Sequence, residues 1–490
     1  MDFIDPDKKR KNTIKLYIGY VLIAIAIVLA SIVLLFYALG YGIGRSGSVV
    51  RNGLVFIDSS PDGADIKIEH NSKIIKQDKT NTRLNIPEGT YNVTLSKTGY
   101  ISWRRSFHLD GGGIERMQYP FLFPEKLDTA NVQTYAKPTL LTTSSPDRRW
   151  IVVHNPANFL TLDIYDGNQT KQDQKVKSIN LPANLFKLNN KDDVLTVTEW
   201  STDNKHVLLQ HTNAQNKQFV MANIEEPDKS ISIDTTFKAS YSNIKLRDKK
   251  FDSMYLLDAS GNLLLGNTGD KSTKQLLTGV IDFKPHGADT ILYVTKKTDQ
   301  EVSANIFTSD KSYQLRALPV GTEYLLDLAQ FDGAWYMAVG TKGQNQLYVY
   351  KNPLDWLKNP DSNQSIFART MRVPNAAKVS FSNNAQFIAL QGGQNFAVYD
   401  AENDRQFSYV ISDALQDENS AKWMDGHRLV VKSNNRVVVF DYDGINKVTL
   451  GSILPGTNAL FDRDYQELYT FAPTEPNQFA LTRTELVIKQ

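Results

Sequence analysis

The chain of 490 residues contains no cysteine. This absence excludes disulfide bonds, zinc–thiolate sites, iron–sulfur clusters and cysteine nucleophiles together. It does not establish a reducing compartment, but an exported form would depend on packing for its stability. The rest of the composition is ordinary, with 41% hydrophobic, 22% charged and 10% aromatic residues, which excludes a collagen-like or wholly disordered chain. At roughly 100–200 residues per domain, the length allows about two to four domains.

The chain also has little net charge, +2 in total. The first fifteen residues hold this excess, because they carry three acidic residues and five basic ones, Lys8, Lys9, Arg10, Lys11 and Lys15. Residues 16–490 carry equal numbers of acidic and basic residues. A nucleic-acid-binding protein needs a basic surface that neutralises phosphates. We therefore expect no nucleic-acid partner.

One uncharged stretch, residues 16–44, lies near the N-terminus. Within it, Val21–Leu39 is apolar apart from Ser31 and Tyr37 and contains no proline. Nineteen helical residues span roughly 28 Å, close to the thickness of the hydrocarbon core of a bilayer. Aromatic residues flank both ends of the run, as is usual at membrane interfaces. The sequence predicts one transmembrane helix over residues 16–44, preceded by a basic leader over residues 1–15.

Basic residues are more frequent before this predicted helix than after it, where only Arg45 and Arg51 are close. The positive-inside rule then places the leader in the cytoplasm and everything after residue 50 outside the cell membrane. A cleaved signal peptide is the alternative, although its apolar region usually has about 7–15 residues and Ala38-Leu39-Gly40 is a poor cleavage site. The Gly40-x-x-x-Gly44 spacing lies at the membrane exit, where we interpret it as a flexible stretch rather than a helix-dimer motif.

After the predicted helix, the hydrophobic period changes to two residues, which indicates strands with one buried face. Turn clusters separate the candidate strands, which cover residues 53–58, 65–69, 84–86, 91–95 and 101–107. In the turn Pro87-Glu88-Gly89-Thr90, proline fixes one backbone angle and Gly89 is expected to adopt a positive φ. Residues 52–124 therefore form a first, small β-domain.

Three segments of this region resemble a PEGA domain, a small extracytoplasmic β-sandwich named after its Pro-Glu-Gly-Ala turn. They are Ser59–Asp65, Ile86–Ser96 and Lys97–Tyr100. Thr90 stands in place of the alanine, which matters little at an exposed turn. The resemblance implies a surface-associated module of bacterial and archaeal envelope proteins, used as a spacer or in adhesion. Trp103 with Arg104 and Arg105 could form a sugar- or lipid-facing patch, but we favour a half-buried strand tryptophan.

The remaining residues, 130–490, repeat one pattern of a polar turn, a short apolar strand, a loop and a second apolar strand. The repeats are marked by turns at Asp147, Asp203, Asp248, Gly287, Gly333, Asn384, Gly426 and Asp464. These eight markers are on average about 45 residues apart, the length of one four-stranded propeller blade. Helical periodicity is nearly absent, and the best helical candidate is the short segment Asn352–Lys358.

Aromatic residues recur just before the turns, as expected of an inner strand that packs against the next blade; they are Trp200, Phe283, Phe331, Phe381, Trp423 and Phe461. The Ser-Pro-Asp turn and the Tyr-Asp strand endings are similar to those of TolB-type and WD-repeat-like propellers. This resemblance implies a fold only, with eight blades, or seven if one marker is misread. The expected fold class is all-β: an N-terminal single transmembrane helix, a small PEGA-like β-sandwich, then a seven- or eight-bladed β-propeller.

Motifs of common catalytic and metal sites are missing from the sequence. There is no G-x-S-x-G elbow, no H-E-x-x-H sequence and no EF-hand loop. His206 and His211, five apart on a predicted strand, would point to opposite faces and could not share one ion. The run Asp441-Tyr442-Asp443-Gly444 looks like part of a cation loop, but such turns commonly connect propeller strands. We therefore predict no catalytic, metal-ligating or cofactor-binding residue, no cofactor and no enzymatic activity.

Three functions fit these features. The favoured one is a membrane-anchored, non-catalytic protein of the cell envelope whose extracytoplasmic propeller binds a protein or a polysaccharide. The second is an enzyme that acts on envelope polymers, which needs carboxylates gathered at the axial mouth of the propeller. The third is a purely structural spacer. The charge of the axial mouth is the feature that separates them.

Overall fold

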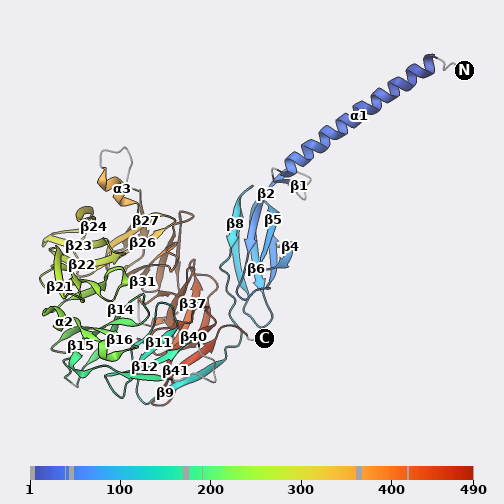
Figure 1. Cartoon of the computed structure of the whole chain (residues 1–490). Helices are drawn as coiled ribbons and strands as arrows, with labels where there is room; N and C mark the ends of the chain where they lie inside the picture. The colour runs from blue at the N-terminus through green and yellow to red at the C-terminus, as the bar shows by residue number, and fades with distance from the viewer. Residues whose placement is uncertain are drawn as a thin grey trace. The chain divides into compact units, whose positions relative to one another are not determined.

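A computed structural model of the chain describes residues 6–38, 40–43, 49–168, 176–189, 191–359, 367–416 and 419–488. The chain divides into two compact units, Met1–Glu125 and Lys126–Gln490 (Figure 1). The first unit holds a long helix and a small β-domain, and the second consists almost entirely of strands.

Helix α1 (Pro6–Ala38) opens the first unit, and an 18-residue window within Lys9–Ala38 has a mean hydropathy of 3.0 and is not buried. This length and composition fit a membrane anchor or a signal sequence. The helix starts before residue 16, because Pro6 suits the first helical turn. The predicted limit at residue 44 is wrong, because Gly40 has a φ of 83° and Tyr41–Ile43 form strand β1. Gly44 lies outside the described residues.

Two four-stranded sheets follow the helix and share one apolar core, as in a β-sandwich. Alternation decides which side chains enter this core: Tyr91, Val93 and Leu95 point inward from one strand and are buried. The first sheet contains β1, β2 (Val49–Ile57), β5 (Thr82–Pro87) and β8 (Ile114–Met117), and the second contains β4 (Lys73–Lys79), β3 (Asp65–His70), β6 (Gly89–Ser96) and β7 (Trp103–Leu109).

Trp103 contributes to this core rather than to a surface patch. Its side chain is only 2% exposed and meets the ring of Tyr119 edge-on. Arg105 points to the same tyrosine and donates a hydrogen bond to its hydroxyl. The possible sugar- or lipid-facing patch is therefore wrong, because its aromatic member is inside the sandwich.

The described residues of the second unit form eight antiparallel sheets that follow one another along the chain; Figure 1 shows their arrangement. Sheets 1 to 4 are β10 (Thr142–Ser144), β11 (Trp150–His154), β12 (Thr161–Asp166) and β13 (Lys177–Asn180); β14 (Val194–Trp200), β15 (His206–Thr212), β16 (Lys217–Asn223) and β17 (Ile231–Ser232); β18 (Asn243–Leu246), β19 (Ser253–Leu257), β20 (Leu263–Asn267) and β21 (Ser272–Leu277); and β22 (Val280–His286), β23 (Thr290–Thr298), β24 (Glu301–Thr308) and β25 (Lys311–Leu318).

Sheets 5 to 8 continue this order, except that the last is completed by the first strand of the unit. They are β26 (Tyr324–Phe331), β27 (Ala334–Thr341), β28 (Gln346–Lys351) and β29 (Phe367–Arg372); β30 (Lys378–Phe381), β31 (Phe387–Gly392), β32 (Asn395–Asp400) and β33 (Arg405–Val410); β34 (Leu415–Gln416), β35 (Lys422–Trp423), β36 (Arg428–Ser433), β37 (Arg436–Asp441) and β38 (Val448–Ser452); and β39 (Leu460–Phe461), β40 (Glu467–Glu475), β41 (Gln478–Glu485) and β9 (Thr129–Tyr135).

Short helices interrupt the strands at five places. They are η1 (Ala183–Leu185), η2 (Pro227–Lys229), α2 (Ile233–Phe237), η3 (Arg247–Lys249) and α3 (Pro353–Lys358). The last of these coincides with the short helical candidate of the sequence, and it buries Leu354 beneath sheet 5.

Contacts between consecutive sheets close the second unit into a ring. Apolar clusters lie between neighbouring sheets, for example Leu162 of sheet 1 with Val207 of sheet 2. The ring closes because β9 pairs with β41 in sheet 8, while Tyr135 of β9 packs with Tyr165 of sheet 1. This arrangement of four-stranded sheets is a β-propeller, and the expected all-β fold class is confirmed.

Each of the eight turn markers in the sequence falls between the first and second strands of one sheet. Hydrogen bonds connect turns of neighbouring sheets. For example, the backbone amide of Asp147 donates to the side-chain oxygen of Asn204 at 2.9 Å. Of the aromatic residues before the turns, Phe331 packs in a cluster with the next sheet, as expected, but two others contact the preceding sheet. Trp200 donates to Thr143 and Trp423 to Ser380, in each case to the preceding sheet.

Candidate functional site

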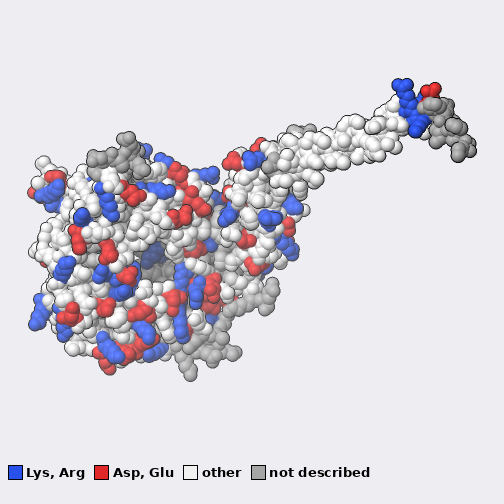
Figure 2. Space-filling model, turned by 45° about the horizontal axis from the view of Figure 1, so that its top comes forward, with Lys and Arg blue, Asp and Glu red and all other residues white. Residues whose placement is uncertain are grey.

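The first strands of the eight sheets lie next to one another around the middle of the ring. Strand β26 contacts both β22 and β30, and β14 contacts β18. Figure 2 shows a hollow near the middle of this unit, with basic side chains inside it. In a propeller, this axial channel is lined by side chains that the fold does not need for its core.

Lysines supply most of the charge that these strands bring toward the channel. Lys245 lies on β18, Lys284 on β22, Lys378 on β30 and Lys422 on β35, and Lys432 joins them from β36. The carboxylates near them come from Glu199 on β14, Asp282 on β22 and Asp327 on β26. Among these described residues, five lysines face three acids.

Two of the three acids act as braces between neighbouring sheets. A carboxylate oxygen of Glu199 accepts a hydrogen bond from the amide of Leu246 at 2.6 Å, and the other pairs with Lys249. Asp327 likewise accepts from the amide of Phe381 at 3.1 Å and pairs with Lys284 at 3.2 Å. Each carboxylate thus holds the first strand of the next sheet. They are committed to the fold and do not converge as a catalytic pair.

The third acid, Asp282, is surrounded by the channel wall. Burial raises the pKa of this carboxyl, while its bond from the Phe283 amide and the charges of Lys245 and Lys284 act in the opposite direction. Together with the two bracing carboxylates, it balances the lysines of sheets 3 and 4. The acids of the channel are therefore concentrated on sheets 2 to 5.

Three further lysines lie on sheets 6 and 7. Lys378, Lys422 and Lys432 form a group that we call the lysine cluster. Burial is the main cause that lowers the pKa of Lys378 to about 8, followed by the charges of Lys422, Lys432 and Lys284. Among the residues that the structure describes, no acid acts on Lys378, and its ammonium makes neither a hydrogen bond nor an ion pair.

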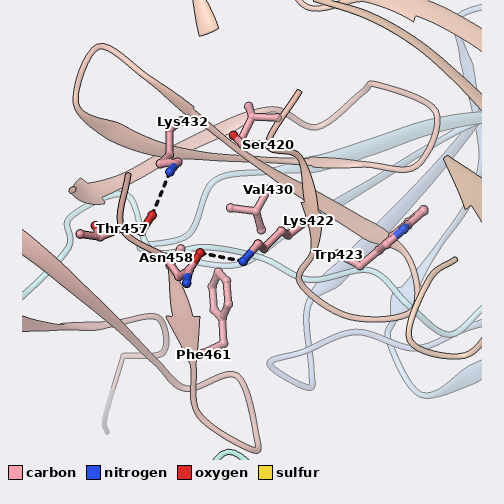
Figure 3. A pocket seen from close by; sticks show the side chains of 10 residues that line it. Ser420, Lys422, Trp423, Val430, Lys432, Thr457, Asn458 and Phe461 are labelled. Atoms are coloured by element: carbon pink, nitrogen blue, oxygen red, sulfur yellow. Dashed lines mark hydrogen bonds between the residues drawn. The ribbon is translucent and has the colours of Figure 1, made fainter. Parts of the chain in front are cut away.

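Two lysines of the cluster, Lys422 and Lys432, line a pocket of about 90 Å³ between sheets 7 and 8 (Figure 3). Lys422 donates to the side-chain oxygen of Asn458 at 2.7 Å, and Lys432 donates to the carbonyl of Thr457 at 2.8 Å. Apolar side chains, among them Val430 and Phe461, complete the lining. Lys422 is exposed to water although protein surrounds it on most sides, which lowers its pKa.

None of these lysines was singled out by the sequence, which predicted no site residue. A signal was present, because a lysine lies three to six residues before four of the turn markers, at Lys245, Lys284, Lys378 and Lys422. The signal was missed because the alternation of side chains along a strand does not indicate which end of the strand lies at the axis of the propeller. An enzyme that acts on envelope polymers would need acidic residues at the channel. Most of the charged residues described above are instead lysines.

Histidines and acids do not form a metal site in the described part of the chain. His206 bonds to Asp203 at 2.6 Å, and buried His211 bonds to Asp193 at 2.8 Å, so the two rings have separate partners. In the Asp441–Gly444 run, Asp441 accepts a hydrogen bond from Asn446 at 2.8 Å. That carboxylate stabilises the turn between β37 and β38.

Residues 52–119 match the PEGA domain family. The resemblance noted in the sequence is thereby confirmed for the sandwich, whose strands β2 to β8 fall within or across this range. No curated protein matches the chain.

Among solved structures, the chain is similar to several propellers at low sequence identity. The Dos1 propeller is 12% identical with a TM-score of 0.45, covering 74% of this chain and 95% of that one. Sqt1 of Saccharomyces cerevisiae is 12% identical with a TM-score of 0.42, covering 72% and 97%. Dihydro-heme d1 dehydrogenase NirN is 11% identical with a TM-score of 0.41, covering 64% and 66%. These similarities concern the fold and carry no argument about function.

Proposed function

We propose that the chain is a membrane-anchored, non-catalytic protein of the cell envelope whose propeller lies outside the cytoplasm and binds a protein or a polysaccharide. Helix α1 anchors the chain, with the basic leader on the cytoplasmic side. The PEGA domain acts as the surface-associated module between anchor and propeller. The propeller provides the binding surface.

The lysine cluster is the observation that carries this proposal. A buried or crowded charge costs free energy, so a fold tends to keep it only where it has a use. Lys378 has no bonded partner among the described residues, and its charged neighbours are lysines. Such a site favours a partner with anionic groups, which both acidic proteins and acidic polysaccharides provide.

Binding rather than catalysis is favoured by the roles of the acids. Glu199 and Asp327 hold the first strands of neighbouring sheets, which leaves them unsuited to moving protons. An enzyme of envelope polymers would require two carboxyl groups facing a common space. The basic channel fits an anion-binding role better.

Retention on isolated envelope fractions tests this function. A chain that starts at Arg51 should bind an envelope fraction, and removal of the PEGA domain by starting at Lys126 should leave binding largely intact. Glutamine at both Lys378 and Lys422 should reduce retention, whereas Lys271→Gln, in an exposed turn of sheet 3, should not. Protease or glycosidase treatment of the fraction identifies the partner as protein or polysaccharide. If binding follows residues 51–125 instead, the propeller is not the recognition module.

The location is tested separately on whole cells, stripped of their wall where necessary. Added protease should degrade the chain after residue 50 and spare an N-terminal tag. Protection of the C-terminal unit would overturn the proposed orientation.

A further inference from the structure

We propose that two adjacent cavities between sheets 3 and 4 bind two consecutive uncharged sugar units of a polysaccharide. The inference rests on the proposed binding role of the propeller and names polysaccharide as the partner. The larger cavity has a volume of about 340 Å³ and the smaller one about 280 Å³. Arg247 and Ala288 line both, so the two cavities adjoin. Each volume is near the lower end of the range for small-molecule sites, about 300 Å³.

The strand register of sheet 3 builds one wall of the larger cavity. Tyr255 of β19 pairs with Leu265 of β20, which pairs in turn with Lys274 of β21. Directly paired residues of antiparallel strands point to the same face of their sheet. These three side chains line the cavity together with Leu276 of β21, so this wall is one face of sheet 3.

Two turns of sheet 4 form the opposite wall. The turn between β22 and β23 contributes Ala288 and Asp289, and the turn between β24 and β25 contributes Ser309 and Asp310. Ser309 and Asp310 are the two residues that join β24 to β25, and both have positive φ values, 50° and 57°. This is the geometry of a tight two-residue hairpin, which gives the wall a defined shape.

Hydrogen bonds between the two sheets fix the boundary between the cavities. Arg247 donates from Nε to the carbonyl of Ala288 at 2.7 Å and from Nη2 to the carboxylate of Asp289 at 3.0 Å. The hydroxyl of Tyr255 donates to the same carbonyl at 2.7 Å. A guanidinium has five N–H donors, so Arg247 is held in position and keeps donors for a ligand.

Other polar side chains of the larger cavity are not engaged by the fold. Among the described residues, the side chains of Lys274, Ser309 and Asp310 make no hydrogen bond or ion pair, and all three residues are exposed. They offer an ammonium donor, a hydroxyl and a carboxylate acceptor. A sugar hydroxyl both donates and accepts hydrogen bonds, so it can pair with each of these groups.

The charges around the cavities favour an uncharged ligand. The larger cavity is lined by two basic and two acidic side chains, so its charges balance. The smaller one adds Lys250 with Asp248 and Asp252, an excess of one acid. An anionic ligand would therefore meet more acids than bases, and like charges placed together weaken binding. Hydroxyl groups avoid this repulsion.

Apolar surface in the larger cavity suits the C–H face of a sugar ring. Leu265, Leu276 and Phe307 line it and are each half-buried, so part of each residue stays exposed to a ligand. Burial of apolar surface is favourable, and an aromatic ring offers a large contact area for it. The lining of the smaller cavity is more polar and includes Ser253 and Asn267. One sugar unit can thus pack on the apolar wall while the next forms hydrogen bonds.

Ligand-observed NMR titration of the full chain in zwitterionic nanodiscs tests the proposal. The probes are the neutral disaccharides cellobiose, maltose and N,N′-diacetylchitobiose, with glucose and N-acetylglucosamine as their single units. At least one disaccharide should bind at least fivefold more tightly than its own monosaccharide, because it occupies both cavities. Digalacturonate, an acidic disaccharide, should bind more weakly than that neutral disaccharide.

Lys274→Met and Asp310→Gly should each weaken binding of that disaccharide at least fivefold. Both residues are exposed, and glycine suits the positive φ of Asp310, so both variants should fold. The controls are Lys271→Met, in the turn before β21, and Asp332→Gly, in the two-residue turn between β26 and β27. Neither control residue lines the cavities, so each change should alter the affinity less than twofold. A thermal unfolding curve checks every variant.

Absence of saccharide binding, a gain over the monosaccharide below fivefold, tighter binding of digalacturonate, or equal losses in the controls would overturn the inference. Binding of a blocked neutral tripeptide in place of every saccharide would indicate a protein partner and overturn it as well. If envelope binding depends on Lys378 and Lys422 while no disaccharide binds, this inference fails and the proposed function stands. If the disaccharide binds through Lys274 and Asp310 while envelope fractions do not retain the propeller, the proposed function fails and the sugar site stands.

Discussion

The folded state disfavours the charged form of Lys378. Its pKa is lowered from an ordinary 10.5 to about 8, first by burial and then by the charges of Lys422, Lys432 and Lys284. A lowered pKa means that folding disfavours the charged form, at about 1.4 kcal/mol for each unit. Because water in the channel reaches part of the side chain, we expect about 1–2 kcal/mol. The residue therefore lowers the stability of the unit in which it lies.

Lys378→Met should raise the free energy of unfolding at pH 7 by about 1–2 kcal/mol. The sign follows from proton counts: between pH 8 and 10.5 the unfolded chain holds the proton that folded Lys378 has lost, so wild-type stability rises with pH there. The variant should lack this part of the rise. Urea unfolding of both chains at pH 7 and pH 10 measures the difference, with Lys271→Met as the exposed control. A variant less stable than the wild type at pH 7 would contradict the argument.

At the scale of single elements, the turn that leads into β6 depends on a glycine, because its backbone has a positive φ. Gly89 has a φ of 154°, outside the range that residues with a side chain readily adopt. A Cβ at this position would also lie 3.4 Å from the hydroxyl of Tyr91. That hydroxyl donates to the carbonyl of Pro87 at 2.7 Å, which fixes the turn. The positive φ expected from the sequence is thus confirmed.

Gly89→Val should destabilise the sandwich by about 1 kcal/mol or more, because a β-branched side chain is strained at this φ and crowds Tyr91. The control is Thr90→Val, one residue later in the same strand, where valine suits the extended backbone. Thermal unfolding followed by the signal of Trp103, which is buried in the sandwich, measures both variants. Equal midpoints for the two variants would contradict the prediction.

Elements were predictable where a local pattern decides them. Alternation located five strands of the sandwich but not β1, β4 and β8. Turn residues such as Asp147 and Gly333 marked the step from first to second strand in the sheets of the propeller. Features that depend on distant parts of the chain were not predictable. The C-terminal end of α1 depends on the pairing of β1 with β2. The contact of Trp200 with the preceding sheet depends on the packing of one sheet against the next.

The candidate site was not predictable for the same reason. Lys378, Lys422 and Lys432 lie on separate strands and meet only because the sheets close into a ring. Taken singly, each reads as a surface lysine on a short strand. Their joint charge becomes visible only when the axial ends of the strands are known.

At the scale of the whole propeller unit, closure depends on a strand from the other end of the sequence. Strand β9 pairs with β41 along its length, from Thr129 opposite Thr484 to Tyr135 opposite Phe479. Tyr135 also reaches sheet 1, where its hydroxyl bonds to Asp163 at 3.0 Å and to Tyr165 at 2.6 Å. The expected start of the propeller at residue 130 is therefore too late, since it cuts β9 near its first residue; the unit begins at Lys126.

A chain that starts at Lys126 should fold as the complete ring, whereas one that starts at Lys137 should lose it. Removal of β9 exposes the backbone edge of β41 and the buried side chains of Leu481 and Tyr165, and it leaves the carboxylate of Asp163 without one of its donors. We expect a lower unfolding midpoint and concentration-dependent association through the open edge. Thermal unfolding and light scattering measure the two effects. Addition of a peptide covering residues 126–136 should restore part of the lost stability, because it supplies the missing strand. A shortened chain that stays monomeric with an unchanged midpoint would show that sheets 1 and 8 hold together without β9.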